Sequence, residues 1–208
     1  MFTPLHTARR RALLAAASLL LAACQESSTV PADAPQSLTD ASAAHAHAGA
    51  GADVKLTNDQ LKVIAQVRAA TARFHDVEEA VRAGYVVQYP AGCATSPSGT
   101  QGFHYLNPTL AADAVIDPLT PELLMYEPAP NGRLELVGVD YVIKYSTLPA
   151  NTLPKPTVLG VDMMNNDPLA VWALHIWSRR PNPSGMFAAW SPDVSCTYAS
   201  IARLPQLP

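Results

Sequence analysis

The sequence predicts an α+β domain in which one N-terminal helix packs on a curled, mostly antiparallel β-sheet or partial barrel with long Pro-rich loops. Three observations predict this class. Helical periodicity occurs in one long stretch, residues 57–84, and the later apolar runs are short and rich in Val, Tyr and Trp, as strands are. Of the 19 prolines, 16 lie between residues 90 and 208, where they exclude further long helices. Strands that follow a single helix favour the α+β arrangement.

The predicted helix has recognisable signals at both ends. Thr57 is a good N-cap residue, and Gln60 follows it at the spacing of a capping box. Apolar residues then recur at helical spacing as far as Val81, and Gly84 stands where a C-cap glycine is expected. These signals predict one continuous helix between Thr57 and Gly84.

Strands are expected wherever short apolar runs are bounded by turn residues. The last of these runs is apolar on both faces, which is typical of a strand that is buried on both sides. The expected strands cover residues 85–89, 102–106, 122–127, 134–145 and 169–177.

The N-terminus has the pattern of a lipoprotein export signal. Three arginines at 9–11 precede an apolar run at 12–21, and small residues then lead to a cysteine, Cys24. This pattern predicts that residues 1–23 are a signal peptide and that lipid, including palmitate, on Cys24 anchors the chain to a membrane. Gln25 follows the cysteine, which indicates sorting to the outer membrane, facing the periplasm or the cell surface. The alternative is a secreted protein with a chance cysteine at this position.

The rest of the chain divides into a tether and a domain. Residues 24–54 are dominated by Ala, Ser, Pro and other small or polar residues, which predicts a disordered tether, and residues 55–208 form a domain of ordinary size. Without the three arginines of the signal peptide, the mature chain has 11 basic and 17 acidic residues, a net charge of −6. Because there is no basic patch, nucleic acid is not an expected partner.

Two cysteines remain in the mature domain. In an oxidising compartment, the even pair Cys93 and Cys196 predicts a disulfide bond. Such a bond would close a loop of about 100 residues and stabilise the domain by up to about 4–5 kcal/mol. The alternative is that the two thiolates bind a metal ion.

Polar residues within the apolar strands mark a candidate site. His104, Glu127, Asp140 and His175 each lie among apolar neighbours, and His75 on the predicted helix is a fifth candidate. Because a buried unpaired carboxylate is costly, the two acids need partners. The four strand residues could form a structural hydrogen-bond network, or they could converge on a divalent ion such as Zn, Cu, Fe or Mn. The sequence leaves both interpretations open.

Six segments of the domain form a recognisable set. They are GFHYLNP at 102–108, YEP at 126–128, LVGVDY at 136–141, LHIW at 174–177, NPSGMF at 182–187 and SC at 195–196. Together they resemble an uncharacterised family of bacterial secreted proteins and lipoproteins, which often has Glu where this chain has Asp140. The resemblance implies a shared fold and export, and it implies no activity.

Three functions are consistent with this pattern of residues. The first is a membrane-anchored envelope lipoprotein that binds a divalent metal ion or small ligand at the polar cluster. The second is a metal-dependent enzyme that uses the same residues. The sequence lacks the catalytic motifs Gly-x-Ser-x-Gly and His-Glu-x-x-His and a Cys–His pair with a free thiol. It therefore does not show whether the protein is an enzyme. The third is a structural or interaction lipoprotein of the envelope without a ligand.

Overall fold

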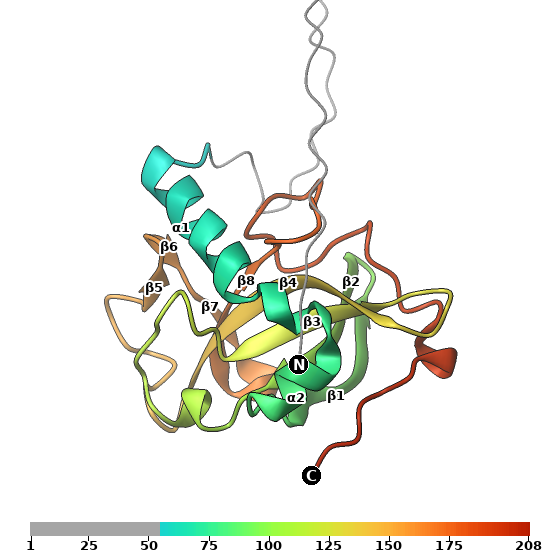
Figure 1. The fold of residues 1–208 in the computed structure, drawn as a ribbon. Coiled ribbons are helices and arrows are strands. Elements are labelled where there is room, and N and C mark those ends of the chain that lie inside the picture. The colour runs from blue at the N-terminus through green and yellow to red at the C-terminus, as the bar shows by residue number, and fades with distance from the viewer. Residues whose placement is uncertain (1–54) are drawn as a thin grey trace, which may run out of the picture. The chain divides into compact units, whose positions relative to one another are not determined.

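The computed structural model describes residues 55–208; the predicted signal peptide, the predicted lipidation site Cys24 and the predicted tether lie outside the described residues. Short helices precede a six-stranded antiparallel sheet that curls into a half-barrel, so the expected α+β class is confirmed (Figure 1). The strand order is β1-β2-β3-β4-β8-β7. Its strands are β1 (Val87–Ser96), β2 (Gly99–Leu106), β3 (Leu123–Pro128), β4 (Leu134–Lys144), β7 (Met164–Asn166) and β8 (Val171–Ile176), and a separate two-stranded sheet is formed by β5 (Thr157–Val158) and β6 (Val161–Asp162).

The continuous helix expected at residues 57–84 is wrong, because the chain forms three successive helical segments there. These are α1 (Asn58–Ala70), the 3-10 helix η1 (Ala72–His75) and α2 (Val77–Arg82). The start of the helix is as predicted: Thr57 caps α1 through a complete capping box with Gln60.

Local side-chain hydrogen bonds account for the break between the helices. The buried hydroxyl of Thr71 donates to the backbone carbonyl of Val67 at 2.7 Å. Such a side-chain hydrogen bond competes with the backbone hydrogen bonds of the helix. Five residues later, the carboxylate of Asp76 accepts from the backbone N–H of Glu78 and acts as the N-cap of α2. The helix therefore ends near Thr71 and a new one begins after Asp76.

Each predicted strand region contains a strand of the main sheet, although β1 begins and ends later than expected. The three shortest strands were not predicted, because two or three residues carry no measurable periodicity. The predicted disulfide is confirmed, and it joins Cys93 on β1 to Cys196 in the C-terminal segment with a Cα–Cα distance of 5.9 Å. Among residues 55–208, no helix is sufficiently long and apolar to span a bilayer.

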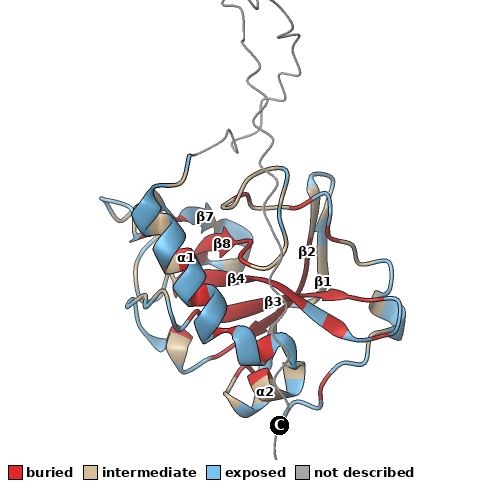
Figure 2. Ribbon diagram, turned by 45° about the horizontal axis from the view of Figure 1, so that its top comes forward, coloured by how far each residue is buried: buried red, intermediate tan, exposed pale blue. Residues whose placement is uncertain are grey.

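The helices cover one face of the sheet. The main core joins apolar residues of the helical segments, such as Val67 and Phe74, to sheet residues such as Tyr126 and Tyr141. Figure 2 shows that α1 exposes its outer side, whereas β3, β4 and β8 are buried along most of their length. The opposite face of the sheet is also covered, and this explains why its central strands are apolar on both sides.

Candidate metal centre

Three of the predicted site residues come from three strands of the sheet. His104 lies on β2, Asp140 on β4 and His175 on β8, and Asp140 and His175 are direct cross-strand partners. Between His104 and Asp140 runs β3, where Met125 is opposite His104 and Leu123 is opposite Asp140. The three polar side chains therefore occupy one face of the sheet, the face turned away from the helices.

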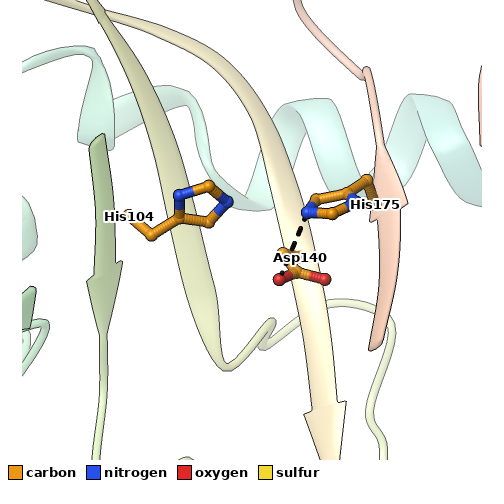
Figure 3. Close-up of side chains that lie close together, drawn as sticks. All are labelled: His104, Asp140 and His175. Carbon is orange, nitrogen blue, oxygen red and sulfur yellow. Dashed lines mark ion pairs between the residues drawn. The ribbon is translucent and has the colours of Figure 1, made fainter. Parts of the chain in front are cut away.

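The curl of the sheet brings these side chains together. From β2 to β8 there are three strand spacings, about 14 Å along a flat sheet. The ring centroids of His104 and His175 are only 5.7 Å apart, so this face of the sheet is concave. Figure 3 shows the two rings and the carboxylate of Asp140 turned toward one another.

The cluster is buried and has apolar surroundings. His104, Asp140 and His175 are 1%, 4% and 5% exposed. On the same face, apolar residues flank them in two separate groups. One group contains Leu106, Leu123, Val142, Val171 and Ala173, and the other contains Met125, Val137, Trp177 and Val194.

The polar atoms of the cluster are poorly satisfied by the protein. Among the described residues, Nδ1 of His104, Nδ1 of His175 and Oδ1 of Asp140 have no hydrogen-bond partner. The closest approach is 3.5 Å, between Nε2 of His175 and Oδ2 of Asp140, which is longer than a good hydrogen bond. Each buried polar group left in this way costs about 1–3 kcal/mol of folding free energy.

Burial sets the protonation states of the three residues. Burial lowers the pKa of His175 to about 4, and burial together with the neighbouring His175 ring lowers the pKa of His104 to about 4. Both imidazoles are therefore neutral at pH 7, the form that binds metal ions. Burial also raises the pKa of Asp140 to about 7, and a cation placed beside the carboxylate would oppose this effect.

The donor set and its spacing fit a single metal ion. Each residue offers one ligand atom, and these three atoms lie within 4.8 Å of one another. Metal–ligand bonds of about 2.1 Å place tetrahedral ligands about 3.4 Å apart, so the 3.5 Å approach of His175 to Asp140 already has this spacing. A small movement of the third ligand would complete the set. Two histidines and one carboxylate form a normal ligand set for Zn²⁺ and for non-haem Fe²⁺.

Glu127, the second carboxylate predicted for the site, lies outside this cluster. It is near the end of β3, where its Oε1 accepts from the backbone N–H of Ser195 at 2.9 Å and its Oε2 forms an ion pair with Arg180. The requirement that a buried carboxylate finds a partner is therefore met here by a loop cation. The expected four-residue strand cluster is corrected to three residues.

His75 does not join the three residues either. It ends η1 on the helical side of the sheet and lines a different pocket, together with Arg179 and Arg180. Burial and the nearby charge of Arg179 lower the pKa of His75. The sequence position of His75 did not show that it lies on the other side of the sheet from His104, Asp140 and His175.

A small cavity adjoins the cluster. Its volume is about 20 Å³, enough for one water molecule or ion. Besides the three candidate ligands, the polar residues in its wall are Tyr89, Gln101 and Asn166. Sequence analysis missed these three residues, because polar side chains near strand ends are ordinary and give no pattern.

Comparison of the chain with protein-family models, curated proteins and solved structures finds no match. The fold and the site therefore define the class of protein: an α+β half-barrel domain with a buried His–Asp–His group that could hold a metal ion.

Proposed function

We propose that this protein is an exported lipoprotein whose domain binds one divalent metal ion through His104, Asp140 and His175. The observation that carries the proposal is the convergence of three buried ligand atoms within 4.8 Å at the concave face of the sheet. In the described residues, Asp140 forms no ion pair with Lys or Arg, and the basic side chains beside it are the buried rings of His175 and His104. A bound cation would neutralise this carboxylate and use a lone pair from each neutral ring.

The competing interpretation, a structural hydrogen-bond network, accounts for the cluster less well. Such a network stabilises a core only when its members are satisfied. Here three polar atoms of the cluster lack partners among the described residues, and no side-chain hydrogen bond joins the two rings to the carboxylate. By contrast, the nearby Glu127 shows how this fold satisfies a carboxylate that serves structure alone.

The ligand set favours Zn²⁺ or Fe²⁺ as the bound ion. Zn²⁺ sites with three protein ligands retain an open position, and two histidines with one carboxylate also form the facial set of non-haem Fe²⁺. Cu²⁺ and Mn²⁺ are alternatives: the same donors bind Cu²⁺ tightly and Mn²⁺ more weakly. An open position is compatible with catalysis, so a metal-dependent enzyme is a second candidate function.

Elemental analysis of the purified full-length chain, prepared without chelators, tests the metal proposal. We expect about one metal ion per chain in the wild type, and loss of this metal in His175→Ala and in Asp140→Asn. Glu127→Gln is the matched control, because it removes a buried carboxylate on the same sheet face and should retain the metal. The proposal would be refuted if the purified wild type contained no metal and its melting temperature did not change on addition of Zn²⁺, Fe²⁺, Cu²⁺ or Mn²⁺.

The lipoprotein part of the proposal is supported by the lipobox-like sequence before Cys24 and by the resemblance to exported proteins. The Cys93–Cys196 disulfide supports export as well, because such bonds persist in oxidising compartments. Metabolic labelling with a palmitate analogue should mark the membrane-bound wild type and leave Cys24→Ser unlabelled. An unlabelled wild type would exclude lipid anchoring and leave the metal site untouched.

A further inference from the structure

We infer that the metal centre exchanges a water-sized ligand at an open coordination position, and that Tyr89 excludes larger ligands from it. This inference rests on the proposed metal binding and goes beyond it. It assigns the site a class of ligand, namely water, hydroxide or a slender anion such as azide, whose coordinating atom can enter the cavity of about 20 Å³.

The number of protein ligands provides the first step. Structural zinc sites are closed by four protein ligands, whereas sites with three protein ligands keep a position for water or another external ligand. Among the described residues, the only group of three or more metal-binding side chains that meets at one point is His104, Asp140 and His175. Among residues 55–208, no fourth His, Cys, Asp or Glu side chain joins this group, and Glu127 is engaged by Arg180 and Ser195.

The cavity provides the second step. It adjoins all three ligands, and its volume of about 20 Å³ limits what can bind there beside the ion. Most of its wall is made of buried side chains of the central strands, such as Leu123 and Val142, which cannot move without disturbing the core. The half-buried part of the wall contains Tyr89, Asn166 and Leu169, so a ligand must enter there.

Tyr89 closes this half-buried part. It lies on β1, one edge of the sheet, and its hydroxyl donates to the backbone carbonyl of Leu169 at 2.6 Å. Leu169 belongs to η3 (Asp167–Leu169), which directly follows β7, the other edge. The hydrogen bond therefore links the two edges of the half-barrel in front of the cluster, and the Tyr89 ring also packs against apolar residues of the same face.

The wall favours a ligand with a polar atom. The side-chain amide nitrogen of Gln101 donates to the carbonyl of Ala189 at 2.7 Å, so its amide oxygen is the atom left to accept a hydrogen bond from a ligand in the cavity. Asn166 provides a second amide in the wall. Water, hydroxide and azide satisfy both the size limit and this polarity, whereas imidazole has polar atoms but exceeds the size limit.

Cobalt-loaded protein provides the test, because the visible absorption of Co²⁺ reports changes in its ligands. We expect Co²⁺ to bind the full-length wild type, azide to change its spectrum, and imidazole to bind at least about tenfold more weakly than azide, since overfilling a packed cavity is unfavourable. Tyr89→Ala should remove this discrimination, and Tyr89→Phe, which loses only the hydrogen bond, should reduce it. Tyr198→Ala, an exposed tyrosine outside the cavity, should behave as the wild type.

Each outcome bears on a different claim. Co²⁺ that binds but does not respond to azide would overturn the open position while the proposed metal binding stands. Equal binding of azide and imidazole to the wild type, or unchanged discrimination in Tyr89→Ala, would overturn the role of Tyr89. Failure of Co²⁺ to bind at all would overturn the proposed function together with this inference.

Discussion

Replacing Asp140 by Asn should stabilise the metal-free protein at pH 8 and abolish any stabilisation by a metal ion. The carboxylate is buried among apolar residues, and burial raises its pKa from 3.8 to about 7. At pH 8 the folded protein must therefore hold a charge that the unfolded chain exposes to water. Asn has nearly the same shape and no charge, so it removes this penalty while it also removes the metal ligand.

The magnitude follows from the shift in the pKa of Asp140. The folded state binds the proton more tightly than the unfolded state, so stability is lost as the pH rises from about 4 to about 7. At about 1.4 kcal/mol per pKa unit, the penalty at pH 8 has an upper limit of about 4 kcal/mol. For a domain of this size, that corresponds to an increase in melting temperature on the order of 10 °C for Asp140→Asn. At pH 5 less than half of the penalty remains.

Thermal unfolding followed by circular dichroism, in chelator at pH 5 and pH 8, measures this difference. Glu127→Gln is the control with the opposite sign, because Glu127 already has Arg180 and the Ser195 N–H as partners. With the metal present at about 100 times its Kd, the wild type should gain about 2.7 kcal/mol and Asp140→Asn should gain nothing. A variant that is less stable than the wild type at pH 8 in chelator would show that the carboxylate is satisfied by the protein, and the reasoning would fail.

Three further predictions concern the framework of the site. Glu122 is buried and its pKa is raised to about 8, so it should add a loss of up to about 1.4 kcal/mol per pH unit between pH 5 and pH 8 to the loss caused by Asp140, and urea unfolding of Glu122→Gln should show a flatter profile than the wild type. Reduction of the Cys93–Cys196 bond should lower the stability by about 4–5 kcal/mol, measured as a fall in melting temperature that a variant lacking both cysteines does not show. Gly102→Ala should destabilise by at least about 2 kcal/mol more than Gly160→Ala, since both have positive φ but only at Gly102 would a Cβ overlap the backbone of β3; equal effects in denaturant unfolding would contradict this reason.

The sequence predicted the fold class and the strands because these depend on local patterns. Periodicity and turn residues fixed the five strand regions, and the N-cap at Thr57 fixed the start of the first helix. The break in the helix after Thr71 was not predicted, because apolar residues continue at helical spacing on both sides of it. A local signal was nevertheless present, since Asp76 is a strong N-cap residue and takes that role in the structure.

Polar residues in apolar strands identified the site only in part. An imidazole or carboxylate in such a strand is costly wherever it lies, so the sequence could flag His104, Asp140 and His175. It identified Glu127 as a site residue for the same reason. The partner of Glu127 is Arg180 in a distant loop, and no local sequence pattern predicts that ion pair. Likewise, Tyr89 reaches the site only because the two edges of the sheet approach each other, which is a property of the complete half-barrel.

The contrast between Asp140 and Glu127 explains how the fold can maintain a metal site. Both lie on strands of one sheet face, yet the carboxylate of Glu127 contacts a guanidinium and a backbone N–H, while burial raises the pKa of Asp140. A polar cluster that destabilises the metal-free protein is expected where a function requires it. The disulfide and the packed strands around the cluster offset that cost in the metal-free state. Since the same carboxylate would become stabilising once it binds a cation, the affinity of the site and the stability of the domain are coupled through Asp140.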